Sequence, residues 1–199
     1  MALAVQANLV ALKVAWSRRA GVDSDLHPIH APPPGVVRRF REVLIDRALL
    51  NEYSDSDLVL RTRQVWGEFS LLCWAFHIRD AQQPPDFAAL APGNPFRCPG
   101  ALVDREQEIA RRLWRLQHEQ RFRLDRDARS DPAFQRDHEY AQSIRMTVDD
   151  QDIRLVPPDA LLAAACEHAG MLGAIRWLID DRRVWNEPGI MRLGEISGT

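Results

Sequence analysis

Three acidic–histidine pairs are the residues in this sequence best suited to metal binding or acid–base chemistry: His118–Glu119, His138–Glu139 and Glu167–His168. Each lies in a segment with helical spacing of apolar residues. Adjacent helical residues point about 100° apart, so one pair alone cannot hold an ion. Neither the HExxH of zinc helices nor the Glu-x-x-His of di-iron bundles is present. A metalloprotein or enzyme site would need two helices to face each other, with His138, Glu139, Glu167 and His168 as its residues.

The other motifs of enzymes and nucleotide-binding proteins are missing from the sequence. There is no GxGxxG, no GxxxxGK[ST] and no GxSxG. The sequence therefore gives little support for a nucleotide-binding fold with a glycine-rich loop or for a serine hydrolase, and we expect no cofactor. A metal-dependent or catalytic function remains the alternative to a binding function.

A run of arginines interleaved with tryptophan suggests a binding surface. Arg111, Arg112 and Arg115 flank Trp114 in one helical segment. Between residues 104 and 139, however, nine arginines are balanced by nine acidic residues. Such mixing is typical of a solvated, ion-paired helix, so nucleic-acid binding is only a third hypothesis. Tryptophan and arginine are also the residues that anchor protein interfaces.

Periodic apolar residues predict helices that would position these groups. Val65, Phe69, Leu72 and Phe76 form the clearest stripe. We predict a mainly α fold, a single compact bundle of five to six helices in one domain spanning 1–199. The predicted helices are 3–19, 36–53, 57–79, 102–124, 130–142 and 159–182. The last is rich in alanine and glycine, so we expect a thin, central helix.

The segments between the helices carry the remaining signals. Alternation in 144–148 and 153–156, around Asp149–Asp152, predicts a small β-hairpin near 144–156. A Pro-rich linker is expected at 21–35. Five prolines forbid a long helix in 80–100, so this segment is expected to be a loop, with at most a short helix at Asp86–Leu90.

Composition favours a cytoplasmic protein. The chain has 199 residues, a net charge of -2 and 46% hydrophobic residues, which is ordinary for a globular domain. Three cysteines fit neither a disulfide framework nor a metal knuckle, and we expect no membrane span and no secretory leader.

The leading hypothesis is therefore a non-enzymatic domain that binds another protein, as an adaptor, chaperone or toxin-neutralising protein. A second copy of the chain is an open candidate partner. The expected contacts lie in the Pro-rich loop and on exposed arginines of the 102–124 helix: Phe87, Phe96, Arg97, Arg111, Arg112, Trp114 and Arg115.

Overall fold

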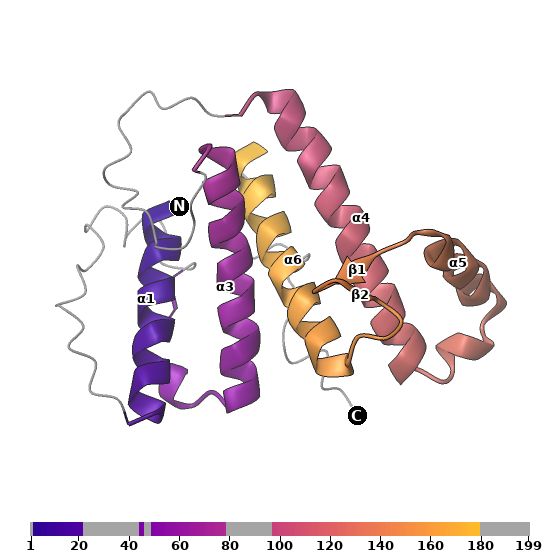
Figure 1. Ribbon diagram of the computed structural model, residues 1–199, viewed down its shortest axis with the longest axis horizontal. Helices are drawn as coiled ribbons and strands as arrows, with labels where there is room; N and C mark the ends of the chain where they lie inside the picture. Colours follow the sequence, from indigo (N-terminus) through magenta and orange to yellow (C-terminus); the bar gives the residue numbers. More distant parts are fainter. Residues whose placement is uncertain (1, 22–43, 46–48, 79–96, 180–199) are drawn as a thin grey trace.

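The computed structural model describes residues 2–21, 44–45, 49–78 and 97–179 (Figure 1). Within these ranges the chain is mainly helical, which confirms the predicted fold class. The helices are α1 (Ala2–Arg19), α3 (Asp55–Ala75), α4 (Pro99–Leu124), α5 (Pro132–Ser143) and α6 (Pro158–Ile179). Short 3-10 turns occupy Leu49–Asn51 and Ala128–Ser130, and a hairpin pairs β1 (Thr147–Val148) with β2 (Gln151–Asp152).

The helix boundaries follow from local capping chemistry. The Ser54 hydroxyl accepts a hydrogen bond from the Asp57 backbone N–H, and the Asp57 carboxylate accepts one from the Ser54 N–H, which closes a capping box before α3. The Asp131 carboxylate caps α5 by accepting from the Ala133 N–H, and proline takes the first helical position of both α4 and α5.

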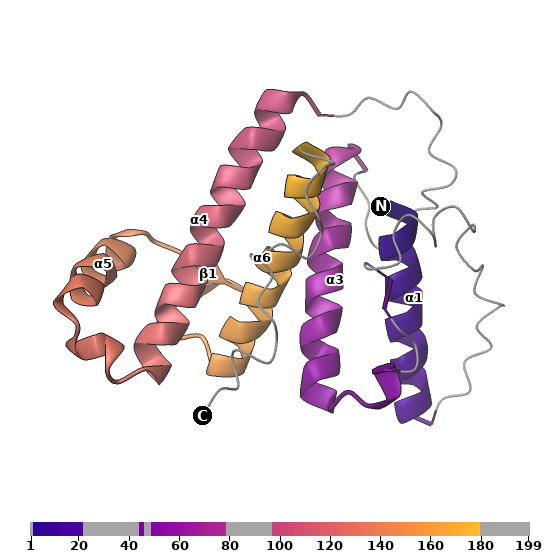
Figure 2. The same cartoon turned by 180° about the vertical axis from the view of Figure 1, so that it is seen from behind.

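The helices pack side by side in an order that differs from the sequence. The contacts between neighbouring helices join α1 to α3, α3 to α6, α6 to α4 and α4 to α5; those of α6 with α3 and α4 are extensive, and that of α5 with α4 is small. Figures 1 and 2 show the same succession from opposite sides, with α6 between α3 and α4. The predicted central position of the last helix is confirmed.

Two apolar cores lie on either side of the contact between α3 and α6. The first joins α1 to α3 and is centred on Val5, Leu12, Leu58 and Phe69. The second joins α6, α4 and the segment after the hairpin, and includes Ile109, Leu113, Leu116, Ile153, Val156, Leu161 and Ile175. The predicted Val65–Phe69–Leu72 stripe of α3 belongs to the first core.

The hairpin is present but shorter than predicted. Each strand has two residues, and the turn between them is Asp149–Asp150, with φ of 49° and 63°. Positive φ at both central residues suits a type I′ turn, so the second strand begins at Gln151 and not at Ile153. Ile153 and Val156 instead pack into the second core.

Several predicted elements lie outside the described residues. These are most of the helix at 36–53, most of the linker at 21–35, most of the loop at 80–100 and the short helix at Asp86–Leu90. Two parts of the 36–53 segment can be compared: Leu44 and Ile45 are not helical, and Leu49–Asn51 form a 3-10 turn. The prediction of an α-helix is wrong at these positions. The assignment of 1–199 to a single domain stays a prediction.

Candidate functional site

The expected contacts of the Pro-rich loop are only partly visible. Phe87 and Phe96 lie outside the described residues. Arg97 is partly buried against Trp74: its Nε donates to the Trp74 carbonyl at 2.8 Å, and its guanidinium lies 4.4 Å from the centre of the indole ring. Arg105 approaches the same ring at 5.7 Å. Arg97 therefore links the segment just before α4 to the end of α3.

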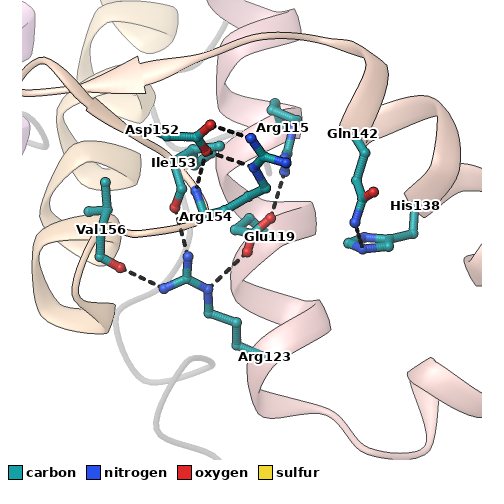
Figure 3. Close-up of polar contacts among 9 residues, drawn as sticks. All are labelled: Arg115, Glu119, Arg123, His138, Gln142, Asp152, Ile153, Arg154 and Val156. Atoms are coloured by element: carbon teal, nitrogen blue, oxygen red, sulfur yellow. Dashed lines mark hydrogen bonds and ion pairs between the residues drawn. The ribbon is translucent and has the colours of Figure 1, made fainter.

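Arg115 is buried, and the expectation that it belongs to an exposed arginine stripe is wrong. Its side chain is 2% exposed, and its Nη1 lies 3.0 Å from Glu119 Oε2. The other oxygen of Glu119 accepts from Arg123 Nε at 2.9 Å. Arg123 also donates to the carbonyl oxygens of Val156 and Ile153, at 2.6 and 2.7 Å (Figure 3).

This Arg115–Glu119–Arg123 network has a structural explanation. The segment after the hairpin lies against α4: Ile153 and Val156 share an apolar core with the stripe of α4, while their carbonyl oxygens accept from Arg123. Arginine suits this place because its planar fork can bond a carboxylate and backbone carbonyls at once. The network joins α4 to the hairpin, so Arg115 is not available to a partner.

The four residues proposed for a metal site are not brought together. His138 and Glu139 lie on α5, whereas Glu167 and His168 lie on α6, and α4 packs against both helices. Glu167 pairs with Arg63 at 3.7 Å, and His168 Nδ1 lies 2.9 Å from the Ala164 carbonyl oxygen. Among the described residues, no three His, Cys, Asp or Glu side chains are grouped so that they could hold a metal ion.

The structure instead joins two histidines from different pairs. His118 of α4 and His138 of α5 stack with ring centres 5.4 Å apart and planes 19° apart. Phe134 stacks on His118 at 4.4 Å, and Phe122 stacks on His138 at 3.7 Å. We call these four residues the His–Phe stack. Each helix contributes a histidine and a phenylalanine four positions apart, and this spacing is the sequence signal from which the stack could have been anticipated.

The positions of both histidines in the stack disfavour the protonated ring. Burial lowers the pKa of His118 and of His138. Within the described part of the chain, His118 Nε2 and His138 Nδ1 have no hydrogen-bond partner, while His138 Nε2 lies 2.8 Å from the Gln142 amide nitrogen (Figure 3). Since the lone pairs of stacked rings lie in nearly parallel planes, they do not converge on a common ion.

An aromatic surface borders the His–Phe stack. The ring of Trp114, partly buried, lies 5.3 Å from His118 and 6.0 Å from Tyr140. Tyr140 is 63% exposed. Arg111 and Arg112, both exposed, lie within one turn before Trp114 on α4. We call Arg111, Trp114 and Tyr140 the α4–α5 surface; it contains two of the residues predicted from sequence and adds Tyr140. Arg112 does not belong to it, because it lies two positions from Trp114 and is close to His168 of α6.

The two exposed arginines before Trp114 differ in their pairing. Arg112 Nε lies 3.4 Å from Glu108 Oε1, one turn earlier on α4. Arg111 has no carboxylate within ion-pair distance in the described part of the structure. Arg111 therefore offers an unpaired guanidinium one turn before the Trp114–Tyr140 ring pair.

Glu68 is a second unusual group, in the middle of α3. Its side chain is 1% exposed, and neither carboxylate oxygen has a hydrogen-bond partner among the described residues. Burial raises its pKa to about 7, against the opposing effect of Arg61. Gln64, one turn earlier, has an unpaired Nε2 in the same part of the structure. Because Glu68 is buried away from solvent, it is not a binding residue. Its carboxyl group instead destabilises the fold when it is ionised.

Two further findings bear on function. None of the described helices combines the length and the apolar run needed to cross a lipid bilayer. Comparison of the chain with protein-family models, with curated proteins and with solved structures found no match.

Proposed function

We propose that this chain is a non-enzymatic protein-binding domain and that the α4–α5 surface is its contact site. The observation that carries the proposal is the contact of the exposed Tyr140 ring with Trp114, one turn after Arg111, whose guanidinium has no carboxylate partner among the described residues. Tryptophan, tyrosine and arginine are the residue types that most often dominate binding energy at protein interfaces. Here all three come together on two packed helices.

The chemistry of the surface indicates what its partner presents. The angle of 49° between the Trp114 and Tyr140 rings leaves two aromatic faces for an apolar side chain. Arg111 would pair with a carboxylate of the partner, since the described structure supplies none. The partner is thus a protein with an apolar residue next to an acidic one, and the domain would serve as an adaptor, chaperone or toxin-neutralising protein.

The same surface is a poor site for nucleic acid. Arg115 and Arg123 share Glu119, and Arg112 pairs with Glu108, so these three guanidinium groups already have carboxylate partners. A phosphate backbone is bound by a continuous row of unpaired cations. The cytoplasm remains the proposed compartment, supported by three unbridged cysteines, two of which are buried.

Site-specific photocrosslinking tests this proposal. Tyr140 is replaced by p-benzoylphenylalanine in cells of the native source, and the matched control carries the same residue at Val59, an apolar position on α3 that is 40% exposed. We expect one protein to crosslink at Tyr140 and not at Val59. The purified partner should then bind the wild-type chain and lose about tenfold or more in affinity with Arg111→Glu.

The control for the charge reversal is Arg18→Glu, an exposed position at the end of α1. Absence of any crosslink at Tyr140, equal crosslinking at Val59, or equal loss of affinity with both charge reversals would each contradict the assignment of this surface.

A further inference from the structure

Helix α5 is held in place chiefly by rings. Its contacts with the described elements are with α4 and with the 3-10 turn at Ala128–Ser130. Phe134 and His138 are the α5 residues of the His–Phe stack, and Tyr140 adds its contact with Trp114. A helix of 12 residues is marginal in water without such packing. The position of α5 therefore depends on the stack.

The stack accepts His118 and His138 only as neutral rings. A protonated imidazole carries two N–H donors and a positive charge. In neutral His138, Nε2 accepts from the Gln142 amide nitrogen, so the ring proton is on Nδ1, which has no acceptor among the described residues. Protonation would add an N–H at Nε2 that points at this amide nitrogen, itself a donor. His118 Nε2 is buried without a partner in the same described region. Protonation of either ring would thus leave a buried, unpaired donor, which is costly.

The charges around the two rings do not compensate for that cost. Those near the rings, from α4, α5 and the Ala128–Ser130 turn, are Arg115, Glu119, Arg121, Arg129, Asp137 and the other histidine. Glu119 is already shared by two arginines. Arg121 lies over Phe134 at 5.2 Å and Arg129 over Phe122 at 5.8 Å, so positive charge surrounds the stack. Asp137 is exposed, and water screens its attraction for His118.

We infer that His118 and His138 form an acid-sensitive latch, whose protonation releases α5 from α4 and separates Tyr140 from Trp114. Acidification then dismantles the α4–α5 surface while α1, α3 and α6 stay packed, because their contacts with one another do not involve the stack. The claim that the latch regulates binding rests on the proposed function. The claim that α5 is released does not, because it concerns this chain alone.

The direction of the effect follows from proton linkage. The docked state disfavours the protonated rings, and the released state exposes them to water, where a histidine titrates near its ordinary value of 6.5. Release therefore becomes more favourable as the pH falls below about 6.5. At pH 5 the shift reaches about thirtyfold for each histidine that stays neutral when docked.

Amide hydrogen exchange of the full chain measures the release. Protection of α5 amides is compared at pH 7.5 and pH 5.0, after correction for the intrinsic pH dependence of exchange. We expect α5 protection to fall about tenfold or more, with α3 and α6 amides retaining theirs. An α5 change within about twofold would overturn the latch, as would an equal loss in α3, which indicates global unfolding.

Two variants identify the titrating groups. The double variant His118→Phe/His138→Phe keeps four stacked rings without a titratable nitrogen, and its α5 protection should be the same at both pH values. His168→Gln is the matched control: it removes a partly buried histidine of α6 whose pKa burial also lowers, and it should leave the wild-type response of α5 unchanged. Equal responses of wild type and double variant would overturn the proposal.

A second measurement on the wild-type chain covers the case in which the double variant does not fold. Imidazole resonances of His118 and His138 are followed by NMR as the pH is lowered. Midpoints below 6.5 that coincide with the loss of α5 protection support the latch, and midpoints at or above 6.5 contradict it. Since neither measurement uses a partner, a failure of the latch is distinct from a failure of the crosslinking experiment in cells.

Discussion

Gly67 of α3 and Gly170 of α6 face each other's helix in a reciprocal arrangement. A Cβ atom on Gly67 would lie 2.0 Å from the carbonyl oxygen of Glu167, and a Cβ on Gly170 would lie 2.0 Å from that of Gln64. Each glycine thus meets the residue three positions before the other. This contact brings the two central helices to backbone distance and separates the two apolar cores.

Replacement of either glycine should force these helices apart. We expect Gly67→Ala and Gly170→Ala each to lower the free energy of unfolding by about 3 kcal/mol. The double variant should lose less than the sum, because one separation relieves both clashes. Urea denaturation measures all three. Gly100→Ala is the control: nothing lies within 4 Å of its Cβ, and this substitution in the first turn of α4 should not destabilise.

Glu68 should make stability fall as the pH rises. The folded chain raises the pKa of this carboxyl from its ordinary 4.5 to about 7, so the folded state holds the proton more tightly than the unfolded state between these values. The contribution of Glu68 to stability is therefore full below about pH 4.5 and declines up to about pH 7.

Glu68→Gln removes this dependence and should be more stable than wild type at pH 8, by up to about 3 kcal/mol relative to their difference at pH 4.5. Denaturation at several pH values provides the comparison, with the exposed Glu52→Gln as control. If the stability difference between Glu68→Gln and wild type does not change with pH, the pKa of Glu68 is not raised by folding and the prediction is contradicted.

Glu119 should be far more important to stability than Glu108, although each carboxylate contacts two arginines of α4. Glu119 holds Arg115 and Arg123 in a buried network, whereas the Glu108 side chain is 43% exposed. We expect Glu119→Gln to cost about 3 kcal/mol or more, since it leaves a buried guanidinium without its counter-charge. Glu108→Gln should cost less than about 1 kcal/mol. Thermal unfolding in the two variants measures the contrast, and equal shifts would contradict it.

The parts of the fold that depend on local sequence were predictable. Residues 159–182 are rich in alanine and glycine, which predicted a central helix. The structure gives the reason, because the missing side chain of Gly170 lets α6 approach the backbone of α3. Apolar spacing located α3 and α4. Both helices start a few residues earlier than predicted, because Ser54 caps α3 and Pro99 takes the first helical position of α4.

The candidate site was only partly predictable, because it depends on which helices meet. Trp114 and Arg111 were identified from residue type. The stack of His118 on His138 arises only when α5 folds onto α4, and periodicity within one helix does not contain that information. Burial of Arg115 has the same origin, since the covering segment, residues 153–156, is distant in sequence.

The most direct test of the α4–α5 surface is the affinity of the crosslinked partner for Tyr140→Ala, measured by isothermal titration calorimetry at pH 7.5. Leu155→Ala is the matched comparison, because Leu155 is 77% exposed on the loop after the hairpin and lies outside the surface. The account predicts that Tyr140→Ala weakens binding by about tenfold or more and that Leu155→Ala changes it by less than about twofold. Unchanged affinity in Tyr140→Ala would contradict it.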